Sequence, residues 1–92
     1  MLDRIKGIIA RLTIKNETDY CMYCILDTLN KNLRGLSYTS MRNTIGAYFT
    51  EKTFNTAWFT LKDRKYIIPI NNTDRYIIGV KIILDYPYEY LL

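Results

Sequence analysis

Apolar residues in this chain first recur at helical spacings and then gather into β-rich runs towards the end. Residues 2–12 predict an amphipathic helix, because its apolar positions are three and four apart: Leu2, Ile5, Ile8, Ile9 and Leu12. Residues 13–15 are interpreted as a connection. A second helix over residues 17–32 has Asn16 as its N-cap and Asp19 three residues on. Gly35 is expected just past its end, where glycine is common.

Two more helices and a hairpin are predicted after residue 35. Residues 36–38 form a bridging strand at most, and Thr39 or Ser40 can cap a third helix across residues 41–49. Thr50 can cap a fourth helix over residues 51–65, whose apolar face carries Phe54, Ala57, Trp58 and Leu61. Residues 66–70 and 75–84 are β-rich runs around a turn at residues 71–74. Pro69 cannot donate to a sheet, which places this hairpin at an edge.

The chain is predicted to be one α+β domain, mostly α-helical, over residues 1–92. Its length of 92 residues suits a single domain. Residues 1–15 are an N-terminal helix or extension, and residues 16–84 are the core. Residues 85–92 are an aromatic tail that we expect to pack on the domain or on a second subunit.

Charge and composition exclude several classes of protein. The net charge of +4 permits nucleic-acid binding without requiring it, and the excess of basic residues lies before residue 66. Histidine is absent, and neither a glycine-rich phosphate loop nor a carboxylate pair stands out, so we expect no enzyme and no cofactor. No apolar run is long enough to span a bilayer, and no signal peptide is evident. A cytoplasmic protein without a membrane partner is therefore expected.

The order helix, helix, short strand, helix, helix, hairpin resembles the winged helix-turn-helix family, with a C-terminal β-hairpin as the wing. Residues 50–67, TEKTFNTAWFTLKDRKYI, carry this resemblance best. Thr50 is the small capping hydroxyl, followed by apolar anchors at Phe54, Trp58 and Leu61, and Ile67 enters the wing. Lys65 stands where the family often has glycine, and the turn at residues 48–50 also lacks glycine. The resemblance implies a DNA-binding regulator and a homodimer that reads palindromic half-sites.

The resemblance also implies a set of DNA-contacting residues. Residues on the outward side of the fourth helix would enter the DNA groove: Lys52, Asn55, Thr56, Phe59 and Thr60, with Lys62 at the edge. Asparagine can pair with adenine, threonine and phenylalanine can meet the thymine methyl group, and lysine reaches phosphate or guanine. Phe59 is alternatively buried against the wing or a partner chain. Arg75 is the candidate cation of the wing. Three residues early in the third helix could hold a phosphate: Thr39, Ser40 and Arg42.

Cys21 and Cys24 form a C-x-x-C pair with three possible roles. The simplest is packing, with two small apolar residues on a buried helix. A redox or intersubunit disulfide is the second role, although the βαβ context of thioredoxin-like sites is missing. A metal site is the third, but it needs four ligands, so only a dimer sharing two pairs could complete it. We favour packing and expect no metal.

Two functional hypotheses remain open. The first is a dimeric, sequence-specific transcription regulator that binds double-stranded DNA. The second is a protein-binding inhibitor or adaptor of a virus or mobile element, built on the same scaffold, because fold does not fix function. Glu51 and Asp63 on the fourth helix would repel phosphates and therefore favour the second hypothesis. The simplest alternative to DNA contact is that the basic residues of the fourth helix form a solvated helix face.

Overall fold

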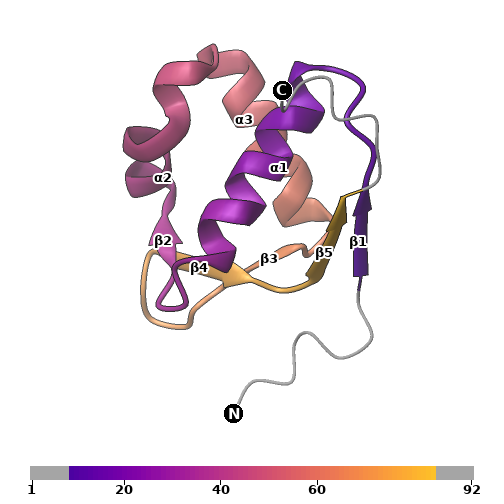
Figure 1. Ribbon diagram of the computed structural model, residues 1–92. Coiled ribbons are helices and arrows are strands. Elements are labelled where there is room, and N and C mark those ends of the chain that lie inside the picture. The colour runs from indigo at the N-terminus through magenta and orange to yellow at the C-terminus, as the bar shows by residue number, and fades with distance from the viewer. Residues whose placement is uncertain (1–8, 85–92) are drawn as a thin grey trace.

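Three α-helices and two small sheets make up residues 9–84, the part of the chain that this computed structural model describes. The elements are, in chain order, β1 (Ile9–Leu12), α1 (Glu17–Asn30), β2 (Leu36–Ser37), α2 (Tyr38–Ile45), the 3₁₀ turn η1 (Gly46–Tyr48), α3 (Glu51–Asp63), β3 (Ile67–Pro69), β4 (Arg75–Ile78) and β5 (Lys81–Leu84). Figure 1 shows α1 crossing α3, with the β3–β4 hairpin at one end of the helices and β1 beside β5 at one side. The α+β class predicted from the sequence is confirmed.

The first described helix begins where the sequence predicts and ends earlier. The side chain of Asn16 accepts a hydrogen bond from the Asp19 N–H at 2.9 Å, which caps α1. The helix ends at Asn30 instead of residue 32. Gly35 therefore lies in the following turn and not directly after the helix, so its expected place was wrong. Its φ of 85° is the left-handed conformation that glycine adopts readily, and it leads the chain into β2.

The third predicted helix is shorter than expected and has a different cap. Ser37 is the N-cap of α2, because its Oγ accepts from the Ser40 N–H at 3.0 Å. Thr39 and Ser40, the caps expected from the sequence, instead lie within the first turn. The α-helix ends at Ile45, and η1 replaces its predicted last turn.

The core forms where α1 and α3 pack against each other. The N-cap Thr50 and the start of α3 at Glu51 are confirmed, and the helix ends at Asp63, two residues before the predicted end. Its predicted apolar face is fully buried, as Phe54, Ala57, Trp58 and Leu61 have at most 1% of their surface exposed. Residues of α1 at helical spacing face it and are equally buried: Cys21, Ile25, Leu26 and Leu29.

The predicted hairpin is confirmed and belongs to a three-stranded antiparallel sheet of order β2-β4-β3. Ile67 pairs with Ile78 and Pro69 with Tyr76. The strand that contains Pro69 lies at the edge of the sheet, as its missing N–H requires. Asn72, with a φ of 65°, supplies the left-handed residue of the turn between the strands.

Two predictions about the strands were wrong. Residues 9–12, expected to be helical, form β1, which pairs in parallel with β5; residues 1–8 of that predicted helix lie outside the described residues. Ala10 and Leu12 are buried while Ile9 and Arg11 are exposed, an alternation of period two that marks a strand. Residues 75–84 are not one strand, because the chain leaves the first sheet after Ile78 and β5 joins β1. The predicted tail, residues 85–92, also lies outside the described residues.

Where the chain leaves the first sheet, glycine at position 79 lets the backbone just after β4 lie close to β3. The Gly79 N–H donates to the Tyr66 carbonyl at 2.8 Å. A Cβ at this position would lie 2.6 Å from Cδ1 of Ile68, well inside van der Waals contact. The two strands therefore separate at a residue that has no side chain to accommodate.

Candidate nucleic-acid interface

The outward face of α3 carries most of the side chains that the sequence predicts to bind DNA. Lys52, Thr56 and Phe59 are exposed, whereas Asn55 and Lys62 are half-buried at one side of this stripe. Asn55, Phe59 and Lys62 follow one another at spacings of four and three, so they are neighbours on the helix surface. Because the opposite face of α3 is buried against α1, these side chains point away from the core.

Asn55 is connected to α2 through the hydroxyl of Tyr38. The Tyr38 hydroxyl donates a hydrogen bond to Oδ1 of Asn55, and it accepts a long one from Nη1 of Arg42 at 3.5 Å. The Tyr38 ring packs edge-on against Phe54 and Trp58, with ring centroids 5.4 and 5.5 Å apart. Tyr38 therefore holds Asn55 of α3 and Arg42 of α2 in fixed positions relative to the core.

Arg42 lies against α3 and is half-buried. Its guanidinium is 5.5 Å from the centre of the Phe54 ring, a distance at which a cation and an aromatic face attract each other. The predicted phosphate-binding role therefore applies to a side chain that already has an aromatic partner. The donors of its guanidinium that do not face Tyr38 are the ones through which Arg42 could reach a phosphate.

Lys62 connects α3 to the hairpin. Its ammonium lies 5.2 Å from the ring centre of Phe59 and 5.5 Å from that of Tyr76 in β4. Tyr76 in turn packs edge-on against Trp58, with centroids 5.1 Å apart. Phe59 is 51% exposed, so the expectation that the wing buries this ring does not hold within the described residues.

The N-terminus of α2 lies beside the beginning of β4. In the antiparallel pairing of β2 and β4, Ser37 is opposite Arg75. Arg75, Thr39 and Ser40 are all exposed. The Ser40 N–H donates to the capping Oγ of Ser37 at 3.0 Å, so this donor of the helix end is already occupied.

Sequence reasoning missed Tyr38 and Tyr76, the two residues that hold this surface together. Tyr38 was assigned to the end of a bridging strand, and Tyr76 to a regular hairpin strand. Their positions at this surface depend on which residues of α3 come near them, and neither helical nor strand periodicity carries that information. An aromatic residue next to each strand end was the one signal available.

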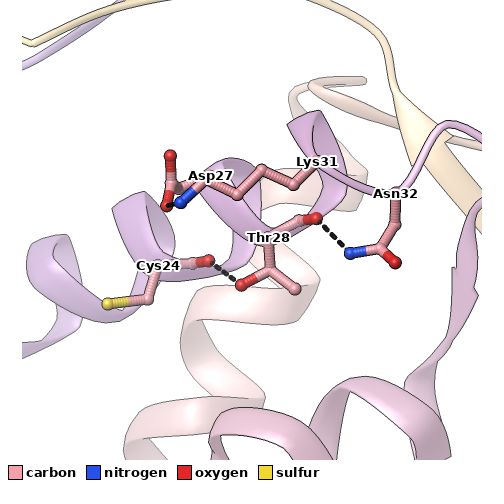
Figure 2. A network of polar contacts seen from close by, with 5 residues as sticks. All are labelled: Cys24, Asp27, Thr28, Lys31 and Asn32. Carbon is pink, nitrogen blue, oxygen red and sulfur yellow. Dashed lines mark hydrogen bonds and ion pairs between the residues drawn. The ribbon is translucent and has the colours of Figure 1, made fainter.

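The two cysteines of α1 are free thiols, of which Cys21 is buried and Cys24 is partly exposed. Burial raises the pKa of the Cys21 thiol to about 12, and burial likewise raises that of Cys24, although a hydrogen bond from Tyr20 partly opposes the shift. Figure 2 shows Cys24 beside side-chain hydrogen bonds to backbone carbonyls along α1, among them the bond that the Thr28 hydroxyl donates to the Cys24 carbonyl at 2.7 Å. Thiols held protonated are poor nucleophiles and poor metal ligands, which favours the packing interpretation.

Residues 9–84 contain neither a metal-binding cluster nor a membrane-spanning helix. Within this range, His, Cys, Asp and Glu residues form no group of three or more that could hold a metal ion. None of the helices found there has both the length and the apolar character needed to cross a bilayer.

Comparison of the chain with family models, curated proteins and solved structures gives no match. The case for a function therefore depends on the geometry described above. Three contacts carry that geometry: Tyr38 joins α2 to α3, Lys62 joins α3 to β4, and the pairing of Ser37 with Arg75 joins the start of α2 to the hairpin.

Proposed function

We propose that this chain binds double-stranded DNA, with α3 in the major groove and the β3–β4 turn against the neighbouring backbone. The observation that carries the proposal is the junction of three segments: the outward face of α3, the N-terminus of α2 and the turn end of β4. The order helix, strand, helix, helix, hairpin from α1 to β4 supports the resemblance to winged helix proteins, although β1 replaces part of the helix that the sequence predicts before α1.

The dimensions and chemistry of α3 support this placement. A helix with its side chains is about 10–12 Å across, and the major groove of B-DNA is about 12 Å wide. The stripe of Lys52, Thr56 and Phe59 presents a cation, a methyl group with a hydroxyl, and an apolar ring to the groove floor. Lys62 stands at the side nearest the hairpin, where a phosphate would lie. Arg75 would reach the backbone from the turn.

Tyr38 acts in this scheme as a positioning residue. By donating to Oδ1 of Asn55 it fixes the carboxamide, so that the amide N–H groups face a base or phosphate without further loss of rotamer freedom. A Tyr38→Phe variant keeps the ring that packs on Phe54 and Trp58 and loses the hydroxyl alone. We expect it to fold and to bind DNA more weakly, by the roughly 0.5–1.5 kcal/mol of one hydrogen bond.

Fluorescence anisotropy with short AT-rich and GC-rich duplexes tests the proposal. Non-specific binding at physiological salt has dissociation constants of about 10⁻⁴–10⁻⁶ M, and the affinity falls steeply as salt rises. Lys52→Ala/Arg75→Ala should weaken binding to every duplex and lower the salt slope by about 2, since each phosphate contact contributes about 0.9.

The matched control removes two positive charges outside the junction. Arg11→Ala/Lys15→Ala changes the net charge equally but lies in β1 and the loop that follows it. The salt slope of this control variant should equal that of the wild type. Absence of binding at low salt, or equal losses in the two double variants, would refute the proposed interface.

A regulator that acts as a homodimer is a further part of this proposal, taken from the family resemblance. Two-fold dimers bind half-sites about one helical turn apart, near 34–36 Å. Analytical ultracentrifugation with and without a palindromic duplex measures the stoichiometry. Two chains per duplex support the dimeric regulator, and one chain per duplex leaves a monomeric DNA-binding domain.

The exposed ring of Phe59 favours a second candidate, a protein-binding surface on the same face. Aromatic residues are enriched where proteins contact one another, and Glu51 and Asp63 lower the positive potential of α3. Phe59→Ala separates the two candidates. It should reduce capture of a protein partner by about 2 kcal/mol or more if Phe59 anchors an interface, and it should leave the salt slope of DNA binding intact.

A further inference from the structure

A pocket of about 490 Å³ opens between α1 and the α2–η1 segment, away from the outward face of α3. Four aromatic rings line it: Tyr20, Tyr23, Tyr48 and Phe49. The rings of Tyr20 and Phe49 meet edge-on with centroids 5.8 Å apart, which joins the two walls. The volume falls in the range of about 300–1,000 Å³ typical of small-molecule sites.

Asp27 and Thr28 give this pocket hydrogen-bond acceptors beside its tyrosine hydroxyls, which can donate or accept. Among the described residues of its lining Asp27 alone is charged, and Thr28 lies next to it in sequence. Thr28 uses its proton to bond the Cys24 carbonyl at 2.7 Å, so the lone pairs of its oxygen are what it can offer a ligand (Figure 2). A carboxylate, a hydroxyl oxygen and aromatic faces all attract a cation.

The charges around the pocket also favour a positively charged ligand. Helix α1 carries Glu17, Asp19 and Asp27 and no lysine or arginine within its bounds. The counter-ion of Asp27 is Lys31, just past the end of the helix, with its Nζ 3.0 Å from Oδ2 (Figure 2). Because the Lys31 side chain is 71% exposed, this ion pair is weak and a ligand cation can replace it.

We propose that this pocket binds a small aromatic molecule that carries a protonated amine. The ring of the ligand lies among the tyrosine and phenylalanine rings, and its ammonium donates to the Asp27 carboxylate and to Oγ1 of Thr28. The proposal does not depend on DNA binding, because the two sites share no residue. A molecule with a neutral or anionic group in place of the amine lacks the attraction between ammonium and carboxylate by which the pocket selects its ligand.

Titration of the ¹⁵N-labelled full chain with three matched compounds tests the proposal. We use 2-phenylethylammonium, the neutral 2-phenylethanol and the anionic 3-phenylpropionate. The ammonium should cause saturable shifts at residues 20–28 and 45–49 and bind about five-fold tighter than the alcohol. The carboxylate should bind more weakly than the alcohol. Equal affinities for the three compounds, shifts that map outside the pocket, or no saturable shift with any compound would overturn the proposal.

Two variants with opposite expected effects on the affinity for the ammonium compound make the test more specific. Asp27→Asn should remove the preference for the ammonium over the alcohol. Lys31→Met removes the competing cation and should tighten the ammonium about two- to three-fold while leaving the alcohol unchanged. Glu51→Gln, which removes one negative charge from α3, should change neither affinity. If Lys31→Met weakens the ammonium, or if Glu51→Gln changes its affinity as much as Asp27→Asn does, the assignment of Asp27 is wrong.

Discussion

Replacing Lys65 by glycine should stabilise the domain, because this residue ends α3 in a conformation that side chains disfavour. The φ of Lys65 is 61°, in the left-handed region. The Tyr66 N–H donates to the Leu61 carbonyl at 2.9 Å, and the Lys65 N–H to the Lys62 carbonyl at 3.0 Å. These two bonds are the Schellman pattern, in which the position of Lys65 is usually glycine.

The expected gain follows from two opposing terms. The left-handed conformation costs a residue with a Cβ about 1–2 kcal/mol. Glycine avoids that strain but loses about 0.5–1 kcal/mol more conformational entropy on folding. The net stabilisation is therefore about 0.5–1 kcal/mol, equivalent to a rise in Tm of roughly 2–8 °C for a domain of this size.

Urea unfolding followed by the fluorescence of Trp58 measures the change. Trp58 is the one tryptophan of the chain and is 1% exposed, so its emission reports loss of the core. Lys65→Ala is the matched control, since it removes the same charge and keeps the Cβ. Asn72→Gly should raise the free energy of unfolding by less than Lys65→Gly does, because asparagine tolerates a positive φ, here 65°. If Lys65→Gly is no more stable than Lys65→Ala, the backbone at this position is not strained and the reasoning fails.

Four other substitutions have defined expectations. Gly35→Ala should cost about 2–4 kcal/mol, because a Cβ would lie 2.5 Å from the Tyr76 carbonyl oxygen at a φ of 85°. Gly46→Ala, where the nearest atom outside the local backbone is 3.4 Å away, should change the free energy of unfolding by less than about 0.5 kcal/mol in the same urea assay. Thr50→Ala removes the α3 cap and should cost about 1 kcal/mol, measured by thermal unfolding. Burial raises the pKa of the Cys21 thiol from 9.0 to about 12, so the contribution of this thiol to stability is complete below pH 9 and declines above it. The difference in free energy of unfolding between wild type and Cys21→Ala should therefore narrow as pH rises from 9 towards 12. A difference that stays constant with pH would contradict the pKa shift.

Local signals predicted the starts of α1 and α3 well because the causes of these helix starts are local. The caps Asn16 and Thr50 satisfy N–H groups within three residues of themselves, so the sequence around each contains the whole interaction. The buried face of α3 follows from the spacing of Phe54, Trp58 and Leu61. Helix ends were less well predicted, since α1 ends at Asn30, five residues before Gly35, and α3 ends at Asp63, where the left-handed residue that follows is Lys65 and not a glycine.

The strands were harder to predict because their partners lie far away in the sequence. Leu12 fits a helical spacing with Ile8 and Ile9, yet it also fits an alternation with Ala10, and only the pairing with β5 selects the strand. Likewise, nothing near Gly79 indicates that the strands before and after it belong to different sheets. The outward face of α3 was predictable from periodicity, whereas its link to Tyr38 was not, because that link requires the packing of α2 on α3.

The parallel pairing of β1 with β5 has a consequence for how the protein is made. The two strands are about 70 residues apart, so the ribosome releases Ile9–Leu12 long before their partners Lys81–Leu84 exist. Until then Ala10 and Leu12, both buried in the finished domain, face solvent on the nascent chain. Closing so long a loop is slow compared with forming the helices and the hairpin, so this small sheet should assemble last. During synthesis, β1 is therefore the first strand of the described residues to leave the ribosome and the last to pair.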